Sequence, residues 1–287
     1  MAQPIAILHK PTPALGACIL AGVERDTRGC SLTDAQRFNY LPVSPMVVIS
    51  WVFEGDLHLV QDGTPGVAPR LGAPLPRLLF SGPHRRPSMS WSPGPLHALS
   101  VGFYPEALRR LMGLSVEPYL DCNLPLQAVA PAPFLQACQA VLDGGGVHAF
   151  AQLQTQLQPL WGEPAQASPV PYLGDWVRAL ATRAAHSSAG RSVRQLQRLV
   201  RDWTGQSQRD LQLFIRADTA LQHYLAWQRG ERRDLASVAA DAGFADQSHM
   251  GRDIRRLTGL SPARLGAHVA TDEAFWYYRL IAAEMQP

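Results

Sequence analysis

The sequence predicts an α+β chain. A small β-barrel or sandwich domain with trailing helices precedes an all-α region of two helix-turn-helix subdomains joined by a linker helix. Three observations predict this fold class. Apolar and polar residues alternate between Pro- and Gly-rich turns in the first third, the period becomes helical after Pro105, and the C-terminal part repeats itself.

The stretch from about 15 to 103 has the pattern of short strands. MVVISWVFEGDLHLVQDG, which starts at Met46, alternates and is rich in β-branched and aromatic residues, and Glu54-Gly55-Asp56 predicts a hairpin turn within it. RLLFSGP (77–83) and HALSVGFY (97–104) repeat the pattern. We expect a barrel or sandwich inside a first domain of residues 1–165.

Three helices are expected between 105 and 161: PEALRRLMG (105–113), PFLQACQAVLDGGG (133–146) and HAFAQLQTQLQPLW (148–161). The third carries an apolar stripe on one face, made by Phe150, Leu153, Leu157 and Leu160. The stripe fits either the domain core or a dimer seam. GEPAQASPVP (162–171) then predicts a linker.

Length and composition favour two ordinary globular domains, because the chain has 287 residues of which 46% are apolar. No run approaches the roughly 18 apolar residues that a membrane helix needs. The first twenty residues, MAQPIAILHKPTPALGACIL, make a poor signal peptide. We therefore expect a cytoplasmic protein without a membrane partner.

The four cysteines, Cys18, Cys30, Cys122 and Cys138, are scattered without the spacing of a zinc site. Ordinary reduced thiols and a redox or metal-sensing role for Cys18 and Cys30 both fit. The histidines of the strand-rich part are isolated from one another, so neither a metal nor a cofactor is expected. Trp51, Trp91 and Phe103 fit either core packing or the lining of a small-molecule pocket.

The net charge of +3 is unevenly distributed. Residues 168–287 carry 16 basic and 12 acidic side chains, a net charge of +4, and every base there is arginine. The planar guanidinium suits phosphate groups and guanine edges. This asymmetry is typical of a nucleic-acid-binding C-terminal part.

An internal repeat appears when the sequence is shifted by 54 residues. Identical or similar residues then coincide: Arg198, Val200, Arg201, Thr204, Gly205, Ser207 and Leu211 align with Arg252, Ile254, Arg255, Thr258, Gly259, Ser261 and Leu265. The chain therefore contains two copies of one supersecondary unit.

The second copy has the signals of a helix-turn-helix. Asp234 is a good N-cap, Gly243 can end the first helix in the left-handed conformation, and Asp246 caps a second helix that stops at Gly259. Its inward face is formed by Met250, Ile254 and Leu257, which leaves Gln247, Ser248, Gly251 and Arg252 outward. The matching outward set in the first copy is Val193, Arg194, Gln197 and Arg198. These types can contact phosphates and base edges.

Between the copies, residues 207–230 predict one helix of about 23 residues before Gly230, roughly 34 Å long. That length is close to one turn of B-DNA, the separation at which two recognition helices enter successive major grooves.

DLASVAADAGFADQSHMGRDIRRLTGLSPARL resembles the second helix-turn-helix of the AraC/XylS family of bacterial transcription regulators. GRSVRQLQRLVRDWTGQSQRDLQLFIRADTAL is similar to the end of the first motif and the start of the linker helix. The resemblance implies a DNA-binding domain over 170–287, with motifs at about 172–206 and 234–265 and a linker helix at 207–229. Matching positions place its DNA-facing sites on Arg194, Gln197, Arg198, Gln247, Ser248 and Arg252. Aliphatic residues occupy three usually aromatic sites, Val200, Met250 and Ile254.

The resemblance also implies double-stranded promoter DNA as the partner, contact with RNA polymerase, a small-molecule effector and a homodimer. An alternative function from a different class is a DNA-repair enzyme with an appended helix-turn-helix. Such an enzyme needs clustered metal-binding cysteines near the N-terminus. No nucleophile elbow, phosphate loop or zinc-protease motif occurs, so a non-enzyme is expected. A protein-interaction adaptor is a third alternative.

Overall fold

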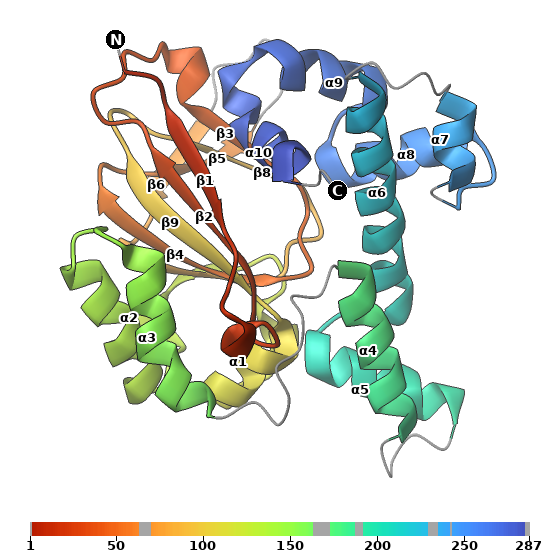
Figure 1. The fold of residues 1–287 in the computed structure, drawn as a ribbon, viewed down its shortest axis with the longest axis horizontal. Helices are drawn as coiled ribbons and strands as arrows, with labels where there is room; N and C mark the ends of the chain where they lie inside the picture. Colours follow the sequence, from red (N-terminus) through yellow and green to blue (C-terminus); the bar gives the residue numbers. More distant parts are fainter. Residues whose placement is uncertain are drawn as a thin grey trace.

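The computed structural model describes residues 2–62, 70–162, 173–186, 192–228, 235–241 and 243–284. Strands fill the N-terminal part and helices the C-terminal part, which lie side by side (Figure 1). The predicted fold class is confirmed, as two packed sheets rather than a closed barrel. No helix within the described ranges is long and apolar enough to cross a membrane.

All strand pairs are antiparallel, and they form two sheets. The six-stranded sheet has the order β1 (Ile5–His9), β2 (Ile19–Asp26), β9 (His97–Phe103), β4 (Val47–Glu54), β7 (Leu78–Ser81) and β10 (Asn123–Pro125). The four-stranded sheet has the order β3 (Phe38–Leu41), β8 (Ser88–Trp91), β5 (His58–Asp62) and β6 (Arg70–Pro74).

The predicted hairpin at Glu54-Gly55-Asp56 is wrong, because β4 and β5 belong to different sheets. Gly55 instead carries the chain from one sheet to the other with a φ of +82°. A Cβ at this position would lie 2.1 Å from the carbonyl oxygen of Pro95, so only glycine fits.

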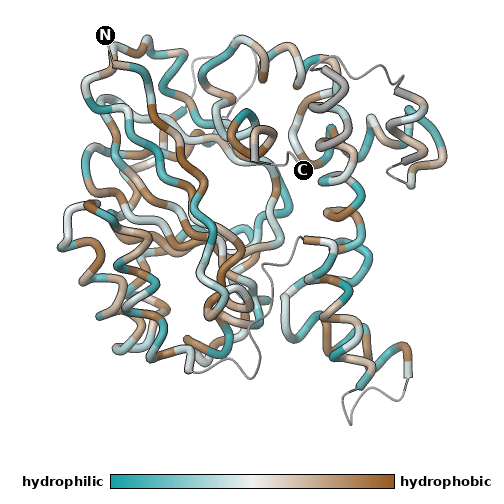
Figure 2. Tube along the Cα trace, in the orientation of Figure 1, coloured by the Kyte–Doolittle hydropathy of each residue, from teal (hydrophilic) through white to brown (hydrophobic). Residues whose placement is uncertain are grey.

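The helices are α1 (Pro105–Met112), α2 (Ala132–Asp143), α3 (Ala149–Trp161), α4 (Leu173–His186), α5 (Val193–Thr204), α6 (Gln208–Gln228), α7 (Leu235–Asp241), α8 (Gln247–Thr258), α9 (Pro262–Thr271) and α10 (Trp276–Glu284). Short 3-10 turns include η2 (Asp34–Arg37), η3 (Glu117–Tyr119) and η5 (Glu273–Phe275). Hydrophilic and hydrophobic residues alternate along the C-terminal helices, as in amphipathic helices (Figure 2).

The six-stranded sheet presents different residues to its two sides. On β4, Ile49 and Trp51 point toward α2, and the Trp51 indole Nε1 donates to the Cys138 carbonyl oxygen at 2.9 Å. Val48 and Ser50, one residue along in each case, point to the other side of the sheet. The alternation along β4 therefore places one set of side chains in the helix-covered core and the other set on the wall of a cavity that lies on the opposite side of the sheet.

The apolar stripe of α3 packs mainly inside the chain. Phe150, Leu153 and Leu157 are buried, and the Phe150 ring stacks on His9 at 5.1 Å. Leu160 is 38% exposed. The burial of the first three residues favours the core interpretation of the stripe, and a dimer remains a prediction.

Candidate nucleic-acid interface

The two helices expected to contact DNA, α5 and α8, begin in the same way. The Ser192 hydroxyl accepts a hydrogen bond from the Gln195 backbone N–H at 3.3 Å, and the Asp246 carboxylate accepts one from the His249 N–H at 2.7 Å. These N-caps satisfy backbone donors that a helix start would otherwise leave open.

The two helices also end in the same way, at positions 54 residues apart. The hydroxyls of Thr204 and Thr258 donate to the carbonyls four residues earlier at 2.7 and 2.8 Å. Gly205 and Gly259 follow with φ values of +72° and +79°, the left-handed conformation that ends helices. The sequence repeat is therefore a repeat of hydrogen-bonded structure.

The second copy has the predicted turn. Gly243 follows α7 with a φ of +75°, and the Phe244 N–H bonds to the Ala239 carbonyl at 2.8 Å while its ring is buried. The predicted cap Asp234 lies outside the described residues, as do residues 187–191 between α4 and α5.

Each helix buries one face and exposes the other. Val200, Met250 and Ile254 are all at most 4% exposed, so the aliphatic residues at the usually aromatic sites still fill the interior. The six predicted DNA-contacting side chains are all exposed: Arg194, Gln197 and Arg198 on α5, and Gln247, Ser248 and Arg252 on α8. A Cβ on Gly251 would lie 3.9 Å from Pro262 Cδ, so nothing inside the chain requires glycine there.

Three of these side chains are arginines: Arg194, Arg198 and Arg252. Within the described ranges none of them has a carboxylate partner. By contrast, Arg201 on α5 lies 2.8 Å from Glu117, and Arg183 on α4 lies 2.7 Å from Glu106. The three outward guanidinium groups are therefore available to an external anion.

The linker helix α6 joins the two units. Its 21 residues make it roughly 31 Å long. Leu211 and Phe214 are buried near its start, and Ala220 and Tyr224 enter the core of the second unit. The linker helix is therefore anchored in both units and joins α5 to α8.

An interaction that the sequence analysis missed links α6 to α8. The Asp253 carboxylate lies 3.7 Å from both Arg216 of α6 and His249 of α8. Phe244 sits beside this group, with its ring centroid 5.5 Å from the His249 ring. The spacing of His249 and Asp253 by four residues was the available signal, because such residues share a helix face.

A cavity of about 570 Å³ lies between the two sheets and the C-terminal helices. Its mainly apolar lining comes from alternate residues of the strands, such as Val48, Val52 and Leu79, and from α6, α8 and α10, which contribute Phe214, Leu257 and Ile281. Lys10 and Arg25 bring positive charge to its wall. The sequence could not reveal it because the lining comes from distant segments.

None of the three predicted pocket aromatics lines this cavity. Trp51 and Phe103 are fully buried against the helices on the opposite side of the sheet. Trp91 donates from its indole Nε1 to the Asp34 carbonyl at 3.2 Å. The error was one of strand parity: the neighbouring residues are the ones that face the cavity.

The cysteines are separated in space as they are in sequence. Cys18 and Cys138 are buried, and burial raises the pKa of both thiols well above the usual range. Cys18 and Cys30 lie beyond opposite ends of β2. Across the described residues no group of three or more His, Cys, Asp or Glu side chains is arranged to hold a metal ion.

Residues 187–267 match a protein-family model described as a helix-turn-helix domain. This region is a helix-turn-helix domain, in keeping with the AraC/XylS resemblance of its sequence. The match covers α5, α6, α7 and α8, so both helices that are expected to contact DNA lie inside it.

No curated protein matches the sequence of the chain. Among solved structures, an apo variant of ToxT from Vibrio cholerae is similar, with 10% identity, a TM-score of 0.38, and coverage of 92% of this chain and 97% of that chain. ToxT bound to an unsaturated fatty acid gives 10% identity, a TM-score of 0.35, and coverage of 92% and 96%.

Proposed function

We propose that this protein is a sequence-specific transcription regulator that reads two successive major grooves of promoter DNA with α5 and α8. The observation that carries the proposal is the pair of capped, equivalent helices, each with an exposed and unpaired arginine at the matched site, Arg198 and Arg252. Such arginines can bond to guanine in a bidentate manner. The roughly 31 Å of α6 supports binding on one face of the duplex.

We further propose that a small molecule in the 570 Å³ cavity controls DNA binding. The inner face of α8 contributes Ile254 and Leu257 to the cavity wall, while its outer face carries Arg252. In addition, the Leu257 carbonyl accepts a hydrogen bond from the Val43 N–H at 2.9 Å. A ligand would therefore touch the sheets and a recognition helix together, which is the arrangement that couples two binding events.

The lining indicates the ligand class. A mostly apolar cavity of this size suits a compact apolar molecule. As a regulator of this kind, the protein would act as a homodimer in the cytoplasm and contact RNA polymerase, and it would not be an enzyme.

Genome-wide mapping of DNA bound by the full chain tests the function. We expect discrete promoter sites that share a two-part sequence. They should disappear from maps of Arg198→Ala and Arg252→Ala and persist with Arg70→Ala, which removes an exposed arginine of β6. Binding without any sequence preference, or none at all, would refute the proposal and favour an adaptor.

A further inference from the structure

The two recognition helices are supported by different parts of the molecule. Most of the buried residues around α8 belong to a core drawn from residues 220–282, against which Phe38 and Tyr40 of β3 also pack, while Leu257 of α8 belongs to the core of the N-terminal part. The buried residues of α4 and α5, including Trp176, Leu180 and Val200, instead belong to one continuous core with the N-terminal strands and helices. Helix α1 of the N-terminal part packs directly against α5.

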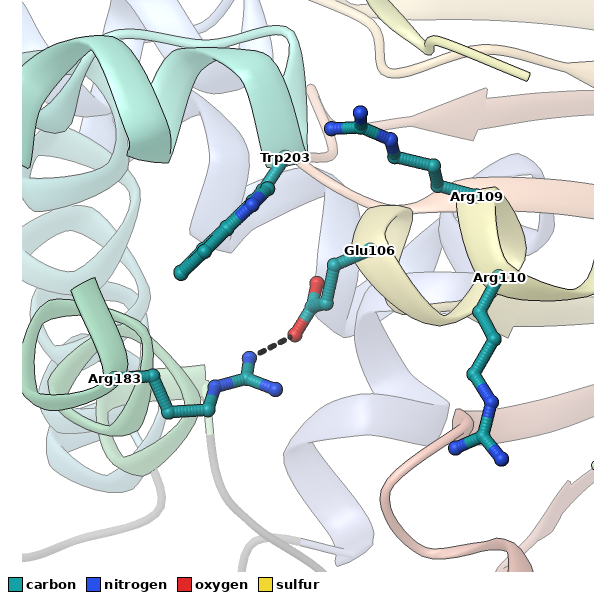
Figure 3. Close-up of a pocket in the computed structure, with 5 residues that line it drawn as sticks. All are labelled: Glu106, Arg109, Arg110, Arg183 and Trp203. Carbon is teal, nitrogen blue, oxygen red and sulfur yellow. Dashed lines mark hydrogen bonds and ion pairs between the residues drawn. The ribbon is translucent and has the colours of Figure 1, made fainter. Parts of the chain in front are cut away.

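Glu106 of α1 is the polar centre of this contact. Its Oε1 accepts a hydrogen bond from the Trp176 indole Nε1 at 2.8 Å and another from Arg183 Nη2 at 2.7 Å. The two donors lie near opposite ends of α4, so one carboxylate holds that helix at both ends. Figure 3 shows the Glu106 carboxylate bonded to Arg183, with Trp203 nearby; all three residues line a pocket of about 400 Å³.

The carboxylate is retained at an energetic cost. Glu106 Oε2 is buried and has no hydrogen-bond partner among the described residues. A buried acceptor without a partner is destabilising. The contribution of Glu106 to the contact is therefore made by Oε1, which bonds to two residues of α4.

The C-terminal end of α5 is attached to the same part of the molecule. Arg201 pairs with Glu117 of η3 at 2.8 Å, and Arg109 of α1 donates to the Asp202 carbonyl at 2.9 Å. A Cβ on Gly205 would lie 3.1 Å from the Glu117 backbone, so the two segments touch at main-chain distance. Meanwhile Arg194 and Arg198 remain exposed. The attachment thus holds α5 without covering its outward arginines.

We propose that Glu106 is a positioning residue for DNA reading: through α4 it sets the orientation of α5, so the N-terminal domain determines how one half of the operator is read. The inference rests on the proposed function, because it requires two helices, α5 and α8, that each contact one half of the operator. Glu106 bonds to α4, whereas most of the core around α8 comes from residues 220–282, so we expect α8 to keep its orientation when Glu106 is replaced. Contacts to base edges are geometrically strict, so a small shift of α5 is sufficient to weaken them.

The experiment uses the full chain and an operator selected from random DNA with the wild-type protein. Every base pair of the operator is then substituted in turn, and the loss of affinity is measured for each variant. Arg198→Ala identifies the half read by α5, and Arg252→Ala the half read by α8. Glu106→Ala is expected to bind the operator roughly tenfold more weakly. Its preference for particular bases should weaken only in the half of the operator that α5 contacts, which Arg198→Ala identifies.

Two further variants make the result specific. Glu106→Gln keeps an acceptor for Trp176 and Arg183 and is expected to restore most of the lost preference. Glu54→Ala removes a carboxylate at the end of β4 that lies 3.6 Å from Arg28, and should behave as wild type. Circular dichroism reports whether each variant folds. If Glu106→Ala does not, Glu117→Ala takes its place, with the same half expected to respond.

If the folded variant loses base preference equally in both halves of the operator, or keeps the wild-type preferences in both, the inference is overturned and the proposed function is left intact. Failure of the wild-type chain to select any sequence would instead refute the proposed function itself.

Discussion

The Arg25 guanidinium donates to the Glu273 carboxylate across the junction between β2 and η5, with Nη2 and Oε1 2.5 Å apart. Arg25 is 5% exposed, and its guanidinium carbon lies 4.8 Å from the centre of the Trp276 ring. Burial lowers the pKa of Arg25, and Glu273 opposes that effect. A buried cation with a single carboxylate partner therefore joins the C-terminal region to the first sheet.

Removal of that carboxylate should destabilise the chain. Glu273→Ala leaves Arg25 buried without its counter-charge, and we expect a loss of about 3 kcal/mol in the free energy of unfolding, measured by urea denaturation. The exposed carboxylate of Glu54 is the matched control, and Glu54→Ala should cost at most about 0.5 kcal/mol. Equal effects would show that Arg25 is not dependent on Glu273.

The outward arginines should contribute to DNA affinity without contributing to stability. Arg198→Ala and Arg252→Ala are each expected to weaken operator binding by about 1–3 kcal/mol, because each removes a base or phosphate contact. Their melting temperatures should stay at the wild-type value, since both side chains are exposed. Gel-shift titration measures the affinity. Wild-type affinity in both variants would exclude these arginines from the interface.

Gly251 is a test of close approach to DNA. Alanine fits the free protein, with its Cβ in ordinary contact with Pro262, and should raise stability by up to about 1 kcal/mol through helix propensity. We expect operator affinity to fall nonetheless, because the added methyl group would lie between α8 and the groove. A more stable variant with unchanged affinity would show that the glycine has no role at the interface.

The thiols should separate into two reactivity classes. Burial raises the pKa of Cys18 and Cys138, so their thiolate populations at pH 8 are small and reagents cannot reach them. Cys30 and Cys122 are partly exposed. Mass spectrometry after brief alkylation of the native chain should find label on the second pair only. Early labelling of Cys18 would reopen a redox role for it.

The local signals in the sequence were sufficient for the recognition helices. The cap at Asp246 and the helix end at Gly259 act within a few residues of their own positions, and the structure has both, with Ser192 and Gly205 at the equivalent sites of the first copy. These features need no knowledge of the tertiary fold, so short-range chemistry predicts them well.

Contacts between distant segments were beyond the reach of the sequence. Alternation in β4 indicates that the strand has two different faces, but not which face meets helices, and for that reason Trp51 was a wrong choice of pocket residue. Glu106 bonds to Trp176, which lies 70 residues further along the chain, and no periodicity in the sequence predicts such a pair. The hairpin at Gly55 failed because only the sheet assignment reveals that the chain changes layers there.

The parity of β4 separates the residues that would meet the proposed ligand from the residues that pack in the helix-covered core. Val48, Ser50 and Val52 face the cavity, while Ile49 and Trp51 support the core from the same strand. Substitutions at Val48 and Ser50 are therefore expected to change the chemical selectivity of the proposed sensor and to spare the helix-covered core, as long as the register of the strand is kept. A repertoire of regulators for different small molecules could be derived from this one scaffold by varying every second residue.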